Sequence, residues 1–225
     1  DTGCFARGWE HGLGEGAAGK VVLALRRSSG ELYAVKRLKQ NMDARERKVC
    51  EAVARCPHPN LTQVLAMIVQ AKRPIALLYT YMDEDVDKYW RRHLMMLPLT
   101  EIMRIMQGMR SGMRHLHSMG VMHRDVKQSN VLLTLGDRRV CLSDFGWCRE
   151  MGSDDAAGAM TKGCTTVAYR APEIFLGSHT YNESIDVWSS GIMLLELLHG
   201  ARFVTDARNP TLGYIEKLVG RIDEK

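Results

Sequence analysis

The hydrophobic pattern of this chain changes near Trp90, and no other feature constrains the fold as strongly. Before Trp90, apolar and β-branched residues form short runs separated by turn residues, a pattern that predicts strands over 20–27, 31–38, 61–69 and 74–82. Residues 43–54 carry apolar side chains at helical spacing instead. After Trp90, helices are expected over 99–117 and 184–200, with two short strands on either side of a turn at 136–137. The chain therefore predicts an α+β fold of two lobes.

Composition narrows the class of protein. The 225 residues carry a net charge of +5 without a long run of like charges, so no nucleic-acid partner is expected. No apolar run is long enough to span a membrane, and Asp83–Asp87 is interpreted as a solvated acidic face. Six cysteines without a CxxC pair argue against a zinc site and favour a reducing, intracellular location in the cytoplasm, the nucleus or both. The chain starts at Asp1 and not at Met, which leaves open that it is a fragment.

A glycine-rich stretch near the start is the first candidate for a ligand site. Gly14, Gly16 and Gly19 follow the pattern GxGxxG, in which backbone amides can approach phosphate oxygens. β-branched residues follow and no helix does, which argues against a dinucleotide-binding unit and predicts a loop between two strands. Lys36 on the next strand is a candidate phosphate ligand. Glu46 is favoured over Glu51 as its carboxylate partner, because Glu46 shares the apolar face of the helix.

Two polar stretches, "HRDVKQSN" at 123–130 and "DFG" at 144–146, carry the residue types that phosphoryl transfer needs. Asp125 can orient an attacking hydroxyl, and Lys127 can reach a transferring phosphate. Asn130 and Asp144 supply hard oxygen ligands for Mg²⁺. A turn that is merely rich in polar residues would not be expected to place these types at these offsets.

Taken in order, these motifs resemble a eukaryotic protein kinase over nearly the whole chain. The set includes "AVK", "HPN", "HRDVKQSN", "DFG", "APE" at 171–173 and "DVWSSG" at 186–191. "YRAPEIFLGSHTY" is similar to the branch of cyclin-dependent and MAP kinases. The resemblance implies a bilobal α+β fold with a small β-rich N-lobe over 1–81 and a larger helical C-lobe over 82–225. The C-lobe is expected to be incomplete, because the last helices of the family fold would follow Lys225.

The resemblance also implies roles for individual residues. Asp125, Lys127 and Thr166 would be catalytic, and Asn130 and Asp144 would hold Mg²⁺. The adenine of ATP would lie between Val21 and Ala34 on one side and Leu132 on the other, beside the gatekeeper Tyr79. The remaining ATP-binding positions implied are Leu13, Gly14, Glu15, Gly16, Ala17, Ala18, Gly19, Lys20, Lys36, Glu46, Thr80 and Met82.

Regulation is implied by three arginines matched to one threonine. Arg45, Arg124 and Arg149 stand where the cyclin-dependent type holds a phosphothreonine, which falls here on Thr161 and would be made by an upstream activating kinase. Protein substrates are the expected partners. A cyclin-like regulatory subunit stays open, because the helix around Arg45 lacks the usual cyclin-binding sequence. Gln128 replaces a common proline, and little effect is expected from that change.

Three functions are weighed. The main expectation is an active Ser/Thr protein kinase that uses MgATP. The alternative is a pseudokinase or scaffold, which the missing C-terminal helices leave open although every catalytic position is filled. A small-molecule kinase is disfavoured, because the "APE" segment forms a platform for peptide substrates in protein kinases.

Overall fold

The computed structural model describes most of the chain. Its described residues are 5–6, 12–16, 19–40, 42, 44–152, 166–178, 181–203, 213, 215–216 and 220. Ala17, Ala18 and Thr161, to which roles were given above, lie outside these residues, as does Thr165, which follows Thr161 in the same polar stretch.

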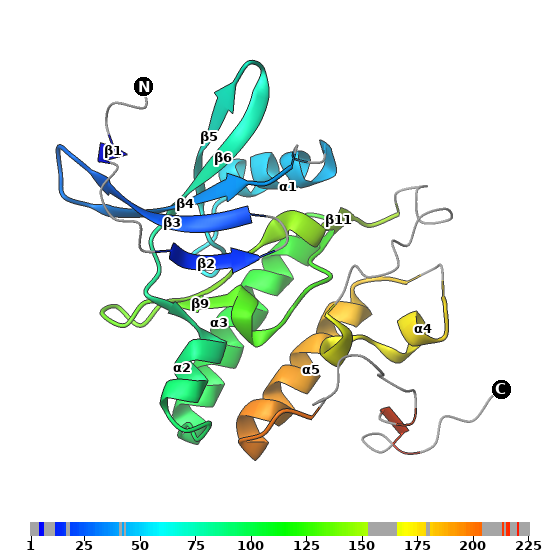
Figure 1. Ribbon diagram of the computed structural model, residues 1–225. Coiled ribbons are helices and arrows are strands. Elements are labelled where there is room, and N and C mark those ends of the chain that lie inside the picture. The colour runs from blue at the N-terminus through cyan, green and yellow to red at the C-terminus, as the bar shows by residue number, and fades with distance from the viewer. Residues whose placement is uncertain are drawn as a thin grey trace.

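A six-stranded antiparallel sheet forms the N-terminal lobe, shown in blue to cyan in Figure 1. Its strand order is β1-β3-β4-β6-β5, and β2 pairs with the first half of β3, residues 19–22. The strands are β1 (Phe5–Ala6), β2 (Gly12–Gly16), β3 (Gly19–Arg26), β4 (Leu32–Leu38), β5 (Val64–Gln70) and β6 (Arg73–Thr80). One helix, α1 (Ala44–Arg55), packs against β5. The predicted lobe boundary between 81 and 82 falls in the link that follows β6.

The predicted hairpin over 20–38 is confirmed as β3 and β4. Its turn is closed by hydrogen bonds from the Arg26 amide to the Glu31 carbonyl and from the Gly30 amide to the Arg26 carbonyl. The strand predicted from Leu61 begins later, at Val64. Leu61 and Thr62 pair with Leu142 of the C-terminal lobe, so the first residues of that apolar run connect the two lobes.

Helices dominate the C-terminal lobe, shown in green to orange below the sheet (Figure 1). They are α2 (Val86–Arg92), α3 (Leu99–Ser118), α4 (Pro172–Phe175) and α5 (Ser184–His199). The helices predicted over 99–117 and 184–200 are thereby confirmed. Gly200 ends α5 with φ = 68°, in the left-handed conformation that glycine adopts without strain. Short strands lie between the helices: β7 (Glu84–Asp85), β8 (Val121–Met122), β9 (Val131–Leu133), β10 (Val140–Leu142) and β11 (Arg149–Glu150).

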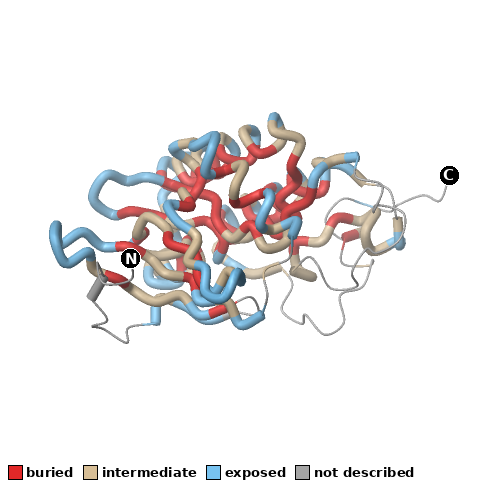
Figure 2. Tube along the Cα trace, turned by 90° about the horizontal axis from the view of Figure 1, so that it is seen from above, coloured by how far each residue is buried: buried red, intermediate tan, exposed pale blue. Residues whose placement is uncertain are grey.

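The core follows the predicted apolar stripe of α3. The apolar residues of that stripe are all buried: Ile102, Ile105, Met106, Met109, Met113 and Leu116. They join residues of α1, α2 and α5 in one hydrophobic cluster that runs through both lobes. Figure 2 shows these buried segments in red at the centre, with exposed loops in blue around them. Within the described residues, no helix has both the length and the apolar composition of a membrane span.

The interpretation of Asp83–Asp87 as a solvated face is wrong. The Asp85 carboxylate caps α2 by accepting a hydrogen bond from the Lys88 amide at 2.9 Å. Asp83 accepts from the Leu135 amide at 2.7 Å, and Asp87 binds Arg91 and Arg202. Val86 between them is fully buried. Local composition suggested solvation, but a helix start and partners distant in sequence use these carboxylates instead.

Candidate active site

A closed polar cluster surrounds Asp125 between β8 and β9. Its Oδ2 atom lies 2.7 Å from Lys127 Nζ and accepts a hydrogen bond from Asn130 Nδ2 at 2.9 Å. Its Oδ1 atom accepts from the hydroxyl of Thr166 at 2.8 Å and from the Thr166 amide at 3.2 Å. Lys127 also donates to the Thr166 hydroxyl at 2.7 Å. The structure thus brings all three predicted catalytic residues into mutual contact, although Thr166 lies about forty positions further along the chain.

The backbone of this loop is held by a buried carboxylate of α5. Asp186 has no exposed surface and accepts hydrogen bonds from the amides of His123 and Arg124 at 2.8 and 2.7 Å. His117 of α3 contacts the same carboxylate at 2.9 Å. Arg124 adopts φ = 65°, a left-handed conformation that is uncommon for a residue with a side chain. The two bonds to Asp186 stabilise this turn.

His123 fixes the other side of the loop. Its Nε2 atom lies 2.8 Å from the Ser143 carbonyl, which can only accept, so Nε2 carries the proton. Its Nδ1 atom then accepts from the Asp125 amide at 3.2 Å. The ring therefore links the backbone of Asp125 to the segment that precedes Asp144.

Lys36, Asp144 and Glu46 meet above this cluster. Lys36 Nζ lies 2.7 Å from Asp144 Oδ1 and 3.8 Å from Glu46 Oε1. Burial disfavours the Lys36 ammonium, but Asp144 and Glu46 outweigh burial and raise the pKa of Lys36. Burial likewise opposes the Asp144 carboxylate, yet Lys36 holds its pKa below the usual value. Glu51, the alternative weighed for Glu46, pairs with Arg47 on the solvent side of α1.

The residues expected around the adenine face one another across the two lobes. Val21 pairs directly with Lys36, and Ala34 pairs directly with Tyr79, so these four side chains lie on one face of the sheet. On β9, Leu132 is half-buried between fully buried neighbours, and its side chain therefore points away from the core of the C-terminal lobe. Met82 lies buried in the link between the lobes, two residues after Thr80 ends β6.

The hairpin of β2 and β3 carries the glycine-rich stretch. Lys88 of α2 donates to the Leu13 carbonyl at 3.0 Å, which ties this hairpin to the C-terminal lobe. Glu15 pairs with Lys39 and lies opposite Lys20 in the strand register. Gly14 and Gly16 belong to β2, and a Cβ atom added to Gly14 would have no described atom within 4 Å outside its chain neighbours. A Cβ atom on Gly19 would collide with the Arg37 carbonyl, so packing of β3 on β4 already demands that glycine.

Of the arginines expected to hold Thr161, Arg124 lies within residues 123–130, the proposed catalytic loop, and Arg149 lies close to it. Arg124 donates to the Trp147 carbonyl at 2.7 Å and to the Tyr181 hydroxyl at 2.8 Å. Arg149 is buried on β11, which pairs with β8 immediately before that loop. Arg45 lies in the first turn of α1, and α1 packs against β11. Thr161 itself lies outside the described residues.

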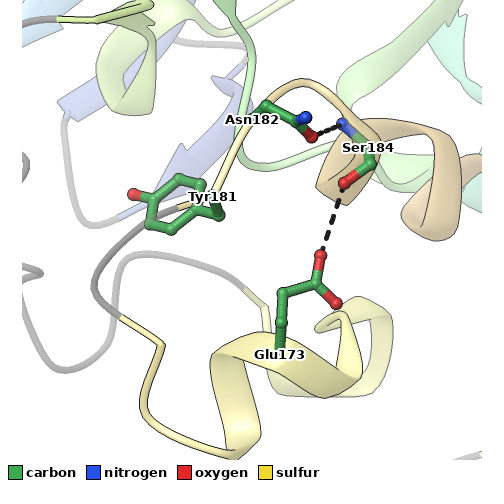
Figure 3. Close-up of a pocket in the computed structure, with 4 residues that line it drawn as sticks. All are labelled: Glu173, Tyr181, Asn182 and Ser184. Atoms are coloured by element: carbon green, nitrogen blue, oxygen red, sulfur yellow. Dashed lines mark hydrogen bonds between the residues drawn. The ribbon is translucent and has the colours of Figure 1, made fainter.

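A cavity of about 460 Å³ opens beside the "APE" segment and is lined by Glu173, Tyr181, Asn182 and Ser184. Figure 3 shows the Glu173 carboxylate pointing toward the Ser184 hydroxyl, which lies 3.5 Å away. Ser184 at the start of α5 is the contact that the structure provides for Glu173.

Sequence reasoning missed a second buried carboxylate, Glu196 of α5. It has no exposed surface and accepts from Gln128 Nε2 at 3.0 Å, from the Tyr169 hydroxyl at 2.7 Å and from Arg202 at 2.8 Å. Gln128, which stands where proline is common, thus ties residues 123–130 to α5 by a hydrogen bond that proline could not make. The available signal was the carboxylate of Glu196 within the apolar run 191–198, since such a charge needs partners.

Comparison with known proteins identifies the arrangement. The family model described as "Protein kinase domain" matches residues 9–218. The chain belongs to the protein kinase family. This membership accounts for a β-sheet lobe over a helical lobe with Asp125 and Lys36 between them.

Several curated kinases are similar to this kinase domain. A putative cyclin-dependent kinase F-2 of Oryza sativa subsp. japonica is 37% identical over 205 residues, which cover 84% of this chain and 61% of the relative. A probable CTD kinase subunit alpha homolog of Encephalitozoon cuniculi is 33% identical over 196 residues, 84% of this chain and 56% of the relative. Mitogen-activated protein kinase 15 of Xenopus laevis is 33% identical, over 94% of this chain and 37% of the relative. The kinase domain thus spans about half of the length of the first two.

Proposed function

We propose that this kinase domain transfers the γ-phosphate of ATP to serine or threonine hydroxyls of protein substrates. The cluster of Asp125, Lys127 and Thr166 carries this proposal. Asp125 orients the substrate hydroxyl and accepts its proton, while the Lys127 ammonium approaches the transferring phosphate. The preference for serine and threonine over tyrosine rests on Lys127, which is typical of that class in this loop.

Asn130 and Asp144 would hold Mg²⁺, and their donor atoms suit that role. Asn130 uses its amide nitrogen to bind Asp125, so its amide oxygen is the end left for a metal. Carboxylate and amide oxygens are ligands that Mg²⁺ prefers. When bound, MgATP supplies the phosphoryl group, and its metal neutralises phosphate charge. Lys36, held by Asp144 and Glu46, would contact the α- and β-phosphates.

The adenine would lie between the sheet face of Val21 and Ala34 and the side chain of Leu132, with Thr80 and Met82 offering backbone groups. Tyr79 narrows the space behind the adenine, because its side chain is hydrogen-bonded to Cys50 of α1. The phosphates would lie under the β2–β3 hairpin. Its proposed contacts are Leu13, Gly14, Glu15, Gly16, Ala17, Ala18, Gly19 and Lys20.

Replacement of Asp125 by asparagine tests the assignment. Asparagine can keep part of the hydrogen bonding but cannot accept the proton, so Asp125→Asn is expected to lower kcat by roughly 10²–10⁴-fold. The affinity for MgATP should change by less than about twofold, since the assigned ATP contacts are other residues. Transfer to a peptide mixture and nucleotide binding by fluorescence give both quantities.

Asp137→Asn is the matched control, because Asp137 is an exposed carboxylate that pairs with Arg139 in the β9–β10 turn. It should leave transfer unchanged. Normal transfer by Asp125→Asn would overturn the base assignment. A wild-type chain that binds MgATP or partners but transfers nothing would instead be a pseudokinase or scaffold.

Phosphorylation of Thr161 by an upstream kinase is the proposed activation step. Arg45, Arg124 and Arg149 would bind the phosphate, and these charge-assisted bonds would order the activation segment. The Arg124 guanidinium is already oriented by Trp147 and Tyr181, which supports the proposal. A cyclin-like subunit stays open as a further partner.

The test compares Thr161→Ala with Thr165→Ala after treatment with an activating kinase. Thr161→Ala is expected to lose the gain in activity that treatment gives, while Thr165→Ala should keep it. Phosphorylation at each site is followed by mass spectrometry. Equal activation of Thr161→Ala and the wild type would remove Thr161 as the switch.

A further inference from the structure

A cavity of about 340 Å³ adjoins the reaction centre and is lined in part by Lys127 and Thr166. Its other walls come from α2, through Asp87 and Arg91, and from Arg202 after the end of α5. Ala168 of the short helix Val167–Tyr169 also lines the cavity. Figure 1 shows α2 and α5 side by side, and the ion pair of Asp87 with Arg202 joins them. A side chain that enters this cavity would therefore belong to a residue close to the phosphate acceptor.

Arg202 forms ion pairs with two carboxylates of this region, Asp87 and Glu196. It binds Glu196 at 2.8 Å and also binds Asp87 and the Tyr169 hydroxyl. Its guanidinium lies 5.3 Å above the ring of Trp90, which fixes its plane. Burial disfavours the charged form, but Tyr169, Glu196 and Asp87 raise the pKa of Arg202, so it remains a cation. Asp87 has Arg91 as a second partner, with Arg91 Nε 3.1 Å from Oδ1.

The arginine side chains that line the cavity are more exposed than the carboxylates that they bind. The side chains of Arg91 and Arg202 are 64% and 26% exposed, whereas Glu196 is fully buried and Asp87 is 22% exposed. Lys127 is balanced by Asp125. Each carboxylate already has donors, so a guest cation would have to displace an internal arginine. An arginine carries five N–H groups, and the described contacts of Arg91 use only Nε, so donors are in surplus for a guest anion.

We propose that this cavity receives an anionic side chain of the peptide substrate, adjacent to the acceptor residue, and that Arg202 determines this preference. The proposal rests on the protein kinase function proposed above. Ala168 is the second specificity-determining residue, because its methyl group leaves the cavity open where a larger side chain would fill it. The shared ligand chemistry is a carboxylate or a phosphate on the peptide.

The experiment uses the full chain and serine peptides in which each position flanking the acceptor carries glutamate, phosphoserine, glutamine or arginine. Binding is measured by fluorescence anisotropy without nucleotide, and kcat/KM is measured with MgATP. At one flanking position, the wild type is expected to favour glutamate or phosphoserine over arginine by roughly tenfold in both measurements. The glutamate and phosphoserine arms show which anion is preferred.

Arg202→Gln should reverse the order, because Glu196 and Asp87 then become available to a guest arginine. Arg91→Gln, at an exposed position that carries little folding risk, should reduce the preference without reversing it. Ala168→Phe should abolish discrimination at that position by filling the cavity. Arg139→Gln, an exposed arginine of the β9–β10 turn, is the matched control and should change nothing.

The outcomes separate this proposal from the function on which it rests. Transfer to all peptides without a charge preference at any position would overturn the cavity assignment and leave the kinase function standing. So would an unchanged preference in a folded Arg202→Gln together with Arg91→Gln. Charge-selective binding without transfer would support the cavity and contradict the proposed function.

Discussion

Cys50 illustrates how burial controls the chemistry of single residues in this domain. It lies on α1 beside Glu46 and is hydrogen-bonded to Tyr79 behind the proposed adenine site. Burial, assisted by the Glu46 carboxylate, raises the pKa of the Cys50 thiol to about 12. Burial also raises the pKa of Cys141 to about 11. Both thiols are therefore protonated and packed, and they act as small apolar side chains.

Alkylation by iodoacetamide at pH 8 should separate the cysteines of the folded protein. Cys56 is exposed and should react at least about 100-fold faster than Cys50 or Cys141, because the thiolate is the nucleophile and both buried thiols have raised pKa values. Peptide mapping by mass spectrometry gives the rate at each site. The difference should vanish in denaturant. Rapid labelling of Cys50 in the folded protein would contradict the described packing of α1.

At the scale of elements, α3 depends on two glycines that bring a loop close to its backbone. A Cβ atom on Gly112 would collide with the Asn60 carbonyl and meet Leu61 Cδ2 at 3.0 Å. A Cβ atom on Gly108 would meet the side chain of Val140. This close approach lets Asn60 form two hydrogen bonds with the backbone of β10. Its side-chain amide donates to the Val140 carbonyl, and its own carbonyl accepts from the Leu142 amide.

Gly112→Ala should therefore destabilise the protein although alanine favours helices. We expect a loss of about 2 kcal/mol in the free energy of unfolding, typical of overpacking in a core. Gly191→Ala is the matched control, because Gly191 lies exposed in α5 and an added Cβ would meet nothing. That change should add about 0.5–1 kcal/mol. Urea unfolding of both variants checks the opposite signs, and a stabilising Gly112→Ala would disprove the close contact.

The sequence predicted elements better than it predicted contacts between them. The hairpin over 20–38 and the buried face of α3 could be predicted because the local spacing of apolar residues indicates which face of an element is buried. The sequence paired Lys36 with Glu46, which lies 3.8 Å away, and did not predict its 2.7 Å contact with Asp144, 108 positions further along the chain. Arg202 was not foreseen, since no motif marks it and its partner Asp87 lies 115 positions earlier. Asp85 was wrongly interpreted as solvated because an aspartate that caps a helix cannot be told from a solvated aspartate by composition alone.

At the scale of the whole molecule, polar contacts tie the lobes together both inside the proposed nucleotide site and at its exposed edge. Lys36 of the sheet reaches Asp144 of the C-terminal lobe, and Lys88 of α2 reaches the Leu13 carbonyl of the β2–β3 hairpin. The first contact lies beside the proposed phosphate site, and the second lies at the outer edge. Together they hold the two surfaces between which a nucleotide would bind.

The nucleotide-free protein should lose stability when the Lys36 contact is removed. Lys36→Met leaves Asp144 without its cation, and we expect a loss of about 2 kcal/mol. This is less than for a fully buried pair, because the Asp144 side chain is 36% exposed. Lys39→Met is the control: Lys39 pairs with Glu15 at the same 2.7 Å but is 48% exposed, so its loss should cost well under 1 kcal/mol.

The pH dependence of this difference has a definite sign. The folded pKa of Asp144 is lowered, so its contribution is present above its ordinary pKa near 3.8 and is lost as the pH falls through the folded value. The folded pKa of Lys36 is raised, so its contribution is lost only as the pH rises above about 10.5. Thermal melts should show a constant gap between wild type and Lys36→Met from pH 5 to 9. A gap that closes within this range would contradict the pairing.

The anchoring of the catalytic loop by Asp186 has a consequence for synthesis on the ribosome. The amides of His123 and Arg124 bind a carboxylate that lies 63 and 62 residues further along the chain. At roughly 5–20 residues per second, a ribosome needs on the order of 3–12 s to add that stretch. During this interval the nascent chain contains Asp125, Lys127 and Asn130 but lacks the bonds that shape their backbone. A nascent chain that stalls before residue 186 would thus present these residues without that support, which makes α5 the element whose synthesis completes the proposed reaction centre.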